Sequence, residues 1–525
     1  MSGRVTTQSA DALRGKRALV MGLGVHGGGL GVARWLLRQG AEVTVTDTAS
    51  REALAAPIAA LDEAAGALGA TVAYTLGEHR AEDFQSHELV VVNPAVRPDS
   101  PWLALAAESG AAVETEMTLF FRACRGTILG VTGTKGKTTT ALLLAAMLRE
   151  RYPDVVAAGN LRVSALEALE GIGPATPVVL ELSSFQLERL GAAGLSPRMS
   201  LITNLSPDHL NWHGTLEAYA AAKRQIYWHQ PADGAVALNG CDDASAEYCT
   251  LWDEGLNRRG GRPIWVAAGP SWSRERSRYP HRVLRAVPTT VERRGGVVIW
   301  SDLAGAFGAR TPLAGEPLFS PEDLRVPGAH NLYNAMAAAA LARAYGVDGE
   351  GIRAAIRGFE GVEHRLELVR ELDGVRYVND TTATNPAAAL AALAATAPPI
   401  VLIAGGADKE LEFAALGAAI ARSVKGLVLL AGSATPRLLE AVAACGTGTG
   451  DAALPGRSHG HIDLPATSRP VIVGPYSDFA EAVRAARELA GPGDTVLLSP
   501  GCASFGMFRN EFHRGEEFRK IVAEL

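Results

Sequence analysis

The segment GVTGTKGKTTT (residues 130–140) combines glycine, lysine and threonine in a pattern suited to binding phosphate. A strand-like run precedes it and the helix-like run ALLLAAMLRE follows it. Glycines let backbone N–H groups approach phosphate oxygens without a Cβ clash, and a helix N-terminus adds partial positive charge. Lys137 adds a point charge, and Thr138 or Thr139 adds a hydroxyl ligand for Mg²⁺. The segment is a shortened P-loop that predicts an ATP phosphate site; the alternative is a turn that only caps a helix.

Two further polar residues follow strand-like runs downstream of this loop. Glu181 ends PVVLEL, and His209 follows another strand in NLSPDHLNWHG. A carboxylate there would complete a magnesium shell around ATP, because ligands bind at the carboxyl ends of parallel strands. Taken singly, a helix cap or a packed histidine explains each residue better than a ligand role does, and it is the two strand ends beside the P-loop strand that favour a metal site.

A second glycine-rich turn, GLGVHG (residues 22–27), fits the G-x-G-x-x-G pattern after a strand. Asp47 closes the next strand at the spacing expected of a dinucleotide site. The same physics serves any nucleotide diphosphate: glycines admit the phosphates, and the acid accepts a ribose or base donor. A purely structural role in helix–strand packing is the alternative.

The elements that must position these residues alternate along the chain between apolar strands and Ala/Leu-rich helices, as in parallel sheets built from βαβ units. The pattern restarts at TILGVTG and again after LRVPGAHN. We therefore expect an α/β protein of three domains, residues 1–125, 126–327 and 328–525. Residues 251–310, rich in Arg, Gly and Trp, are expected to form hairpins or an insertion.

Composition excludes several classes of protein. The chain has 525 residues, 47% of them hydrophobic and 20% charged, which is too apolar for a disordered protein. A net charge of −6 argues against a general nucleic-acid binder. With no apolar leader and no long apolar run, we expect a cytoplasmic protein without a membrane span. The five cysteines, without CxxC spacing, favour neither a disulfide framework nor a zinc ribbon: Cys124, Cys241, Cys249, Cys445 and Cys502.

Six motifs in order along the chain carry a family resemblance: GTKGKTT, LELSSFQLE, NLSPDHLNWHGTLEAYAAAKRQIY, GAHNLYNAMAA, EHRLE and VNDTTATNP. Together they resemble the Mur ligases, ATP-dependent amino-acid-adding enzymes of peptidoglycan synthesis that are related to folylpolyglutamate synthase. GLGVHG with Asp47, and the C-terminal LLSPGCASFGMFRNEFHRGEEF, are most similar to the branch that adds D-glutamate to UDP-N-acetylmuramoyl-L-alanine.

The resemblance implies a UDP-binding Rossmann-like domain, a central P-loop ATPase domain and a Rossmann-like C-terminal domain that brings the amino acid. It also implies an acyl phosphate intermediate, small-molecule substrates and a monomer, with no nucleic-acid or membrane partner. The catalytic residues would be Lys137, His209 and Lys223. One Mg²⁺ would be bound by Thr138 and Glu181, and a second by His209 and Lys223, the lysine as a carbamate formed with CO₂.

The remaining site residues are assigned by the same resemblance. ATP would be bound by Gly133, Thr134, Lys135, Gly136, Lys137, Thr138, Thr139, Asn331, Asn334, His364, Arg365 and Asp380. The UDP substrate would be bound by Gly24, Val25, His26, Asp47, Thr48, Asn160 and Ser183. The incoming amino acid would be bound by Thr384, Lys409, Ser504 and Phe508.

Two departures from the family pattern affect these assignments. Asn160 is followed by Leu-Arg-Val where the family often has Ile-Gly, and Thr382 stands where the family usually has a lysine. The second change removes a cation near the amino-acid pocket and leaves Lys409 as the candidate carboxylate partner. Three other functions are weighed: a different ligase of the family, an NAD-dependent oxidoreductase or nucleotide sensor built on residues 22–47, and a catalytically silent nucleotide-binding protein. The oxidoreductase leaves the P-loop unexplained, and the silent protein would have lost Lys137, Glu181, His209 or Lys223, all of which are present.

Overall fold

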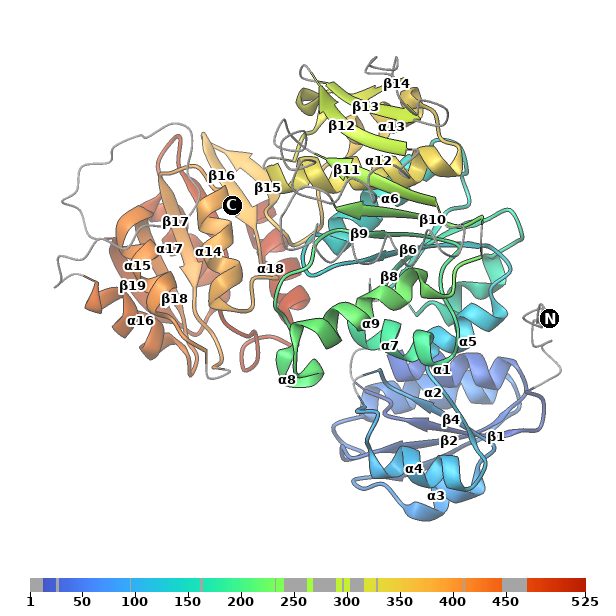
Figure 1. Cartoon of the computed structure of the whole chain (residues 1–525). Helices are drawn as coiled ribbons and strands as arrows, with labels where there is room; N and C mark the ends of the chain where they lie inside the picture. The colour runs from blue at the N-terminus through green and yellow to red at the C-terminus, as the bar shows by residue number, and fades with distance from the viewer. Residues whose placement is uncertain are drawn as a thin grey trace. The chain divides into compact units, whose positions relative to one another are not determined.

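The computed structural model in Figure 1 describes most of the chain and divides it into two compact units, Met1–Phe359 and Glu360–Leu525. The described residues are 13–24, 28–94, 96–160, 164–231, 233–239, 262–267, 289–294, 297–302, 316–326, 329–408, 411–445 and 470–525. Strands and helices alternate through most of the described residues, which confirms the α/β class. In this part of the chain no helix is both long and apolar enough to cross a membrane.

The first unit begins with a parallel sheet in the order β3-β2-β1-β4-β5. Alternate residues of β1 point to opposite faces: Ala18 and Val20 pack in the cluster that includes helix α1, and Leu19 and Met21 pack with Phe84. Both faces are therefore covered, as expected for a Rossmann-like domain. The elements are β1 (Arg17–Met21), α1 (Gly28–Arg38), β2 (Glu42–Asp47), α2 (Ala55–Ala67), β3 (Val72–Leu76), α3 (Ala81–Ser86), β4 (Leu89–Val92), α4 (Pro101–Glu108), β5 (Ala112–Glu114) and α5 (Glu116–Ala123).

A second sheet in the same unit has the order β14-β13-β12-β11-β10-β9-β6-β8-β7 over the described residues. Helices α7 and α9 pack together along one side of its parallel part, and α6 packs with α12 (Figure 1). The elements are β6 (Thr127–Thr132), α6 (Lys137–Arg149), β7 (Val156–Gly159), η2 (Leu166–Gly171), β8 (Pro177–Glu181), α7 (Ser184–Ala192), β9 (Met199–Ile202), α8 (Leu210–His213), α9 (Leu216–Trp228), β10 (Ala235–Asn239), β11 (Arg262–Ala267), β12 (Thr289–Arg294), β13 (Val297–Asp302), β14 (Glu316–Phe319), η4 (Pro321–Asp323), α12 (Ala329–Tyr345) and α13 (Gly349–Gly358).

The described strands within and just beyond residues 251–310 extend this central sheet. β11 is parallel to both β10 and β12, whereas β13 is antiparallel to both β12 and β14. The β12–β13 pair is a hairpin, as the sequence predicted for this region. The rest of residues 251–310 lies outside the described residues.

Helices α12 and α13 pack with the central sheet. α12 contacts α6, β10 and β11, and α13 contacts α6 and β14. The boundary expected at 327/328 assigned both helices to the C-terminal domain, whereas the structure divides after Phe359. The small residues of α12, read as the start of a new domain, instead let it lie close against α6.

The second unit is a six-stranded sheet in the order β15-β16-β20-β17-β18-β19, parallel except for the edge strand β15. Residues of β17 alternate between two cores: Leu402 packs with the cluster of α14, α15 and α16, and Val401 and Ile403 pack with that of α17 and α18. The elements are β15 (Glu367–Leu372), β16 (Val375–Asn379), α14 (Pro386–Ala395), β17 (Ile400–Ala404), α15 (Ala414–Ser423), β18 (Val424–Leu430), α16 (Thr435–Ala444), β19 (Val471–Tyr476), α17 (Phe479–Leu489), β20 (Thr495–Leu498) and α18 (Glu511–Glu524).

Candidate active site

The predicted phosphate loop joins strand β6 to helix α6. Gly136 is the N-cap of α6 with φ of +81°, and Gly133 has φ of +149°, so both need the backbone freedom of glycine. The amine of Lys137 donates to the carbonyl oxygens of Gly133 (3.1 Å) and Thr134 (2.9 Å). Because the first N–H groups of a helix have no partner within it, the start of α6 offers donors and a cation to an anion.

Glu181 connects this loop to a neighbouring strand. Its carboxylate is buried and accepts hydrogen bonds from the hydroxyl of Thr138 (2.8 Å) and the side-chain amide of Asn160 (2.9 Å). A carboxylate beside a hydroxyl is a donor set that suits Mg²⁺. No three His, Cys, Asp or Glu side chains converge as a metal cage among the described residues, so a cation bound here would also need phosphate or water oxygens.

Lys223 is a buried cationic residue on α9, with only 1% of its surface exposed. Its Nζ donates to the carbonyl of Gly133 (2.8 Å) and lies 4.6 Å from the centre of the Tyr219 ring. Burial, followed by the nearby charge of Lys137, holds the pKa of Lys223 well below its usual value. Sequence reasoning did not single out Tyr219, although its spacing from Lys223 places both on one face of the helix.

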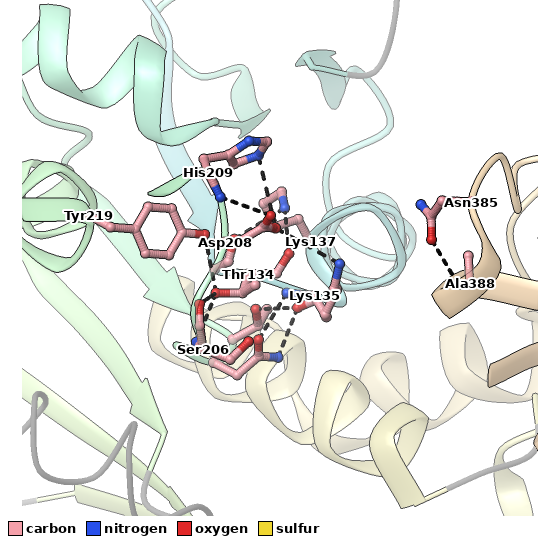
Figure 2. Close-up of polar contacts among 12 residues, drawn as sticks. Thr134, Lys135, Lys137, Ser206, Asp208, His209, Tyr219, Asn385 and Ala388 are labelled. Atoms are coloured by element: carbon pink, nitrogen blue, oxygen red, sulfur yellow. Dashed lines mark hydrogen bonds and ion pairs between the residues drawn. The ribbon is translucent and has the colours of Figure 1, made fainter. Parts of the chain in front are cut away.

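His209 lies in the segment between β9 and α8 and has the left-handed φ of 51°. Its side chain is 48% exposed, its ring centroid lies 5.0 Å from that of Phe185, and its Nε2 lies 3.9 Å from a carboxylate oxygen of Asp208. Figure 2 shows His209 and Asp208 close to the phosphate loop, with Tyr219 hydrogen-bonded to Thr134. The structure therefore brings the P-loop, His209, and Tyr219 and Lys223 of α9 into one region.

Asn204, which the sequence analysis did not select, also contacts the loop. Its side-chain oxygen accepts from the N–H of Lys135 (2.9 Å), and its amide donates to the carbonyl of Lys135 (2.9 Å). The available signal was its position two residues after the end of β9, close to the carboxyl end of a parallel strand, as for Glu181.

The adenine-side candidates Asn331 and Asn334 both lie on α12 and are joined by a 3.3 Å hydrogen bond. Asn334 is buried beside the phosphate loop, because a Cβ added at Gly136 would lie 2.4 Å from its Oδ1. The structure thus brings Asn334 to the ATP-site candidates, although the sequence had assigned it to a different domain.

The glycine-rich turn after β1 is held by Asp47. One carboxylate oxygen accepts from the N–H of Leu23 (2.9 Å) and Gly24 (3.3 Å), and the other accepts from Ala49 (2.9 Å). Among the described glycines of this turn, Gly29 makes the closest approach between helix and strand, because a Cβ there would lie 2.0 Å from the carbonyl oxygen of Gly22. Gly29 lies outside the six-residue motif. Asp47 therefore has a structural role in this turn, and its contact with a nucleotide stays a prediction.

Other predicted UDP-side residues are placed less completely. Ser183 is the N-cap of α7 and forms a capping box with Gln186, and Thr48 is exposed. Val25 and His26 lie outside the described residues. Beside the turn, a hollow is lined by residues that include Gly22, Gly28, Gly29, Asn93 and Glu116.

Comparison with known proteins finds relatives along nearly the whole chain. Three family models match: the Mur ligase MurD-like N-terminal domain over residues 16–115, the Mur ligase middle domain over 131–257, and the Mur ligase glutamate ligase domain over 364–502. A protein of Roseiflexus sp. named UDP-N-acetylmuramoylalanine–D-glutamate ligase is 51% identical over 510 residues, covering 97% of this chain and 99% of the relative. The chain belongs to the Mur ligase family. A Symbiobacterium thermophilum protein of the same name is 37% identical, covering 97% of this chain and 98% of the relative.

Solved Mur ligase structures share the fold. The UDP-N-acetylmuramate–alanine ligase of Thermotoga maritima matches with a TM-score of 0.54 and 18% identity, covering 97% of this chain and 99% of that one. At this identity the match concerns the fold alone. It confirms the three-domain architecture that the resemblance implied.

The second unit of this Mur ligase contains a further group of predicted residues. Asp380 is buried and accepts from Ser499 Oγ (2.8 Å) and from the N–H of Leu366 (3.2 Å). Burial raises the pKa of Asp380 from 3.8 to about 6. His364 is buried nearby, and its carbonyl accepts from the hydroxyl of Thr382 (3.0 Å). Thr382, which stands where the family usually has a lysine, thus uses its hydroxyl in a hydrogen bond within the protein, to the backbone of His364.

The amino-acid candidates are partly assembled within this unit. Ser504 and Phe508 line one small cavity together with Gly405, Gly406 and Arg514. The ring of Phe508 packs against Phe479, with centroids 4.9 Å apart. Thr384 lies just after the loop closed by Thr382, and Lys409 lies outside the described residues.

Proposed function

We propose that this Mur ligase adds D-glutamate to UDP-N-acetylmuramoyl-L-alanine at the expense of ATP, in the cytoplasmic synthesis of peptidoglycan precursors. The observation that carries the proposal is the 51% identity, over nearly all of both chains, to a relative named for this reaction. The arrangement of Lys137, Thr138 and Glu181 supports the ATP-dependent part of it.

The reaction consists of two transfers. The carboxylate of the alanyl group attacks the γ-phosphorus of ATP. The bond between that phosphorus and the bridging oxygen of the β-phosphate breaks, so that ADP departs and an acyl phosphate is formed. The amine of D-glutamate then attacks the acyl carbon, the amide bond forms, inorganic phosphate leaves and the amine loses a proton. Phosphorylation is needed because a carboxylate is a poor electrophile.

The residues of the first unit would act mainly by binding and orienting. Lys137 and the start of α6 would bind the β- and γ-phosphates and offset their charge. Thr138 and Glu181 would bind one Mg²⁺, which when present neutralises developing phosphate charge. His209 and Lys223 would serve a second Mg²⁺, the lysine as a carbamate; the deep burial of its amine beside Tyr219 supports such a specialised role.

The experiment is magnesium-dependent phosphate release with UDP-N-acetylmuramoyl-L-alanine, ATP and a panel of amino acids that includes both glutamate enantiomers. We expect release with D-glutamate alone and none in the variant Lys137→Ala. Release with a different amino acid would keep the ligase mechanism and reject the assigned specificity, which would point to the pocket around Thr382 and Lys409. No release with any amino acid would reject the sugar-nucleotide substrate.

A further inference from the structure

The segment that follows β9 is hydrogen-bonded to the phosphate loop along its length. The carbonyl of Asn204 accepts from the N–H of Thr134 (2.9 Å), and the hydroxyl of Thr203 donates to the carbonyl of Lys135 (2.6 Å). The hydroxyl of Thr134 in turn donates to the carbonyl of Ser206 (3.1 Å) and accepts from its N–H (3.0 Å). Figure 2 shows these contacts converging on Thr134 and Lys135.

The side chain of Asn204 fixes both peptide groups that flank the α-carbon of Lys135. Its Oδ1 accepts from the N–H of Lys135, and its Nδ2 donates to the carbonyl of the same residue, each at 2.9 Å. Only one orientation of the amide satisfies both bonds, because a flipped amide would face donor to donor and acceptor to acceptor. A carboxamide is therefore the side chain that this position requires.

The two segments approach each other closely at Gly133. A Cβ added at Gly133 would lie 1.9 Å from the hydroxyl of Thr203, so the loop backbone rests directly against that side chain. The N–H groups of Thr134 and Lys135 are directed to Asn204, whereas the first N–H groups of α6 have no partner within the helix and can face an anion. His209 is carried by the same segment, a few residues after Ser206.

We propose that Asn204, supported by Thr203, is a positioning residue that holds the phosphate loop in the conformation that binds the nucleotide. The proposal rests on the ATP-dependent function argued above. Asn204 would not touch ATP; it would act by removing the conformational freedom of a glycine-rich loop before the phosphates arrive, which lowers the entropy lost on binding. Because the same segment continues to His209, the loop and that histidine would also keep a fixed separation.

Three substitutions separate this role from a general effect on folding. Asn204→Ala removes both side-chain bonds to Lys135. Asn204→Asp keeps the acceptor and the shape but sets an oxygen against the carbonyl of Lys135. Thr203→Val keeps the shape and removes one of the two donors to that carbonyl. The matched control is Asp348→Ala, which removes the hydrogen bond from the N–H of Gly351 to the Asp348 side chain (2.9 Å) that caps α13. This cap lies beside Glu150, at the C-terminal end of α6, whereas the phosphate loop lies at the N-terminal end.

The test is calorimetric titration of each full-length protein with a non-hydrolysable ATP analogue in Mg²⁺ and, separately, with UDP. We expect the Kd for the ATP analogue to rise at least about tenfold in both Asn204 variants, equal to about 1.4 kcal/mol, and less in Thr203→Val. The Kd for UDP should stay unchanged, and the control should bind both ligands as the wild type does. The melting temperature, measured alongside, should fall by a similar amount in Asn204→Ala and Asp348→Ala.

Equal affinity of the wild type and both Asn204 variants for the ATP analogue would overturn the positioning role while leaving the proposed ligase intact. A parallel loss of UDP affinity would also overturn it, because the effect would then be one of folding. A wild-type protein that binds no ATP analogue would reject the ATP-dependent function and this proposal together.

Discussion

The buried carboxylate of Asp380 should lower the stability of the second unit at neutral pH, and Asp380→Asn should restore it. Burial raises the pKa of this group from 3.8 to about 6, even though Ser499 and the N–H of Leu366 hydrogen-bond to it. Asparagine has nearly the same shape and carries no charge. It keeps an acceptor for Leu366, and the hydroxyl of Ser499 can turn to accept from the new amide.

The magnitude follows from linkage. A folded-state pKa above the unfolded value means that the folded state binds the proton more tightly, so stability falls as pH rises between about 4 and 6 and is then constant. The difference between a pKa of 3.8 and one of about 6 lowers the free energy of unfolding by about 3 kcal/mol above pH 7 and by only about 1 kcal/mol near pH 4.5. Reorganised hydrogen bonds would cost about 1 kcal/mol at either pH. The stability gain from Asp380→Asn should therefore be about 2 kcal/mol larger at pH 7.5 than at pH 4.5.

Hydrogen exchange read by mass spectrometry suits this measurement because residues 360–525 contain no tryptophan to report unfolding. Peptides covering β17 and β20 should exchange more slowly in Asp380→Asn than in the wild type. The exchange rate of the wild type divided by that of the variant should grow about thirtyfold between pH 4.5 and 7.5. Peptides from β6 and β8, in the other unit, provide the internal control. A rate ratio that does not change with pH would show that Asp380 is ionised in the folded state at both values and would refute the argument.

Three other predictions concern the first unit. Gly136→Ala should abolish phosphate release and lower the melting temperature by several degrees, because the residue has φ of +81° and its new Cβ would press on Asn334. The control is Gly110→Ala, where φ is +83° and no atom lies within 4 Å of the new Cβ. This control should show the backbone strain alone and keep full activity. Lys223→Ala should lose turnover and regain part of it with short-chain carboxylic acids that replace the carbamate, and unchanged kinetics in this variant would contradict its assignment. Chelation with EDTA should stop phosphate release and excess Mg²⁺ should restore it, whereas release that persists in EDTA would exclude a required divalent cation.

Local patterns predicted those parts of the fold whose signals lie within one segment. The phosphate loop was identified correctly as a strand–turn–helix because glycine, lysine and a following apolar helix are contiguous in sequence. The α/β class followed from the alternation of strand and helix for the same reason. The hairpin of β12 and β13 was also expected, although its pairing with the central sheet was not.

Features set by distant contacts were beyond that reasoning. α12 was assigned to the wrong domain because its amino-acid pattern is that of any buried helix, and only its packing against α6 reveals where it belongs. The ligand role of Asp47 stays a prediction, but its two bonds to N–H groups of the glycine-rich turn could not be read from the sequence. Asn204 was missed because its partner, Lys135, lies in a different βα unit.

Strand order explains why these residues form one site. β9, β6, β8 and β7 are consecutive neighbours in the central sheet and all run parallel, so their carboxyl ends lie along one edge. Asn204 follows β9 and Glu181 ends β8, on the two sides of the phosphate loop that follows β6, and Asn160 comes directly after β7. The sequence identified the ends of these strands but not their order. Given the order, any polar residue at the end of one of the four strands or within two residues after it becomes a candidate, and this rule includes both Glu181 and Asn204.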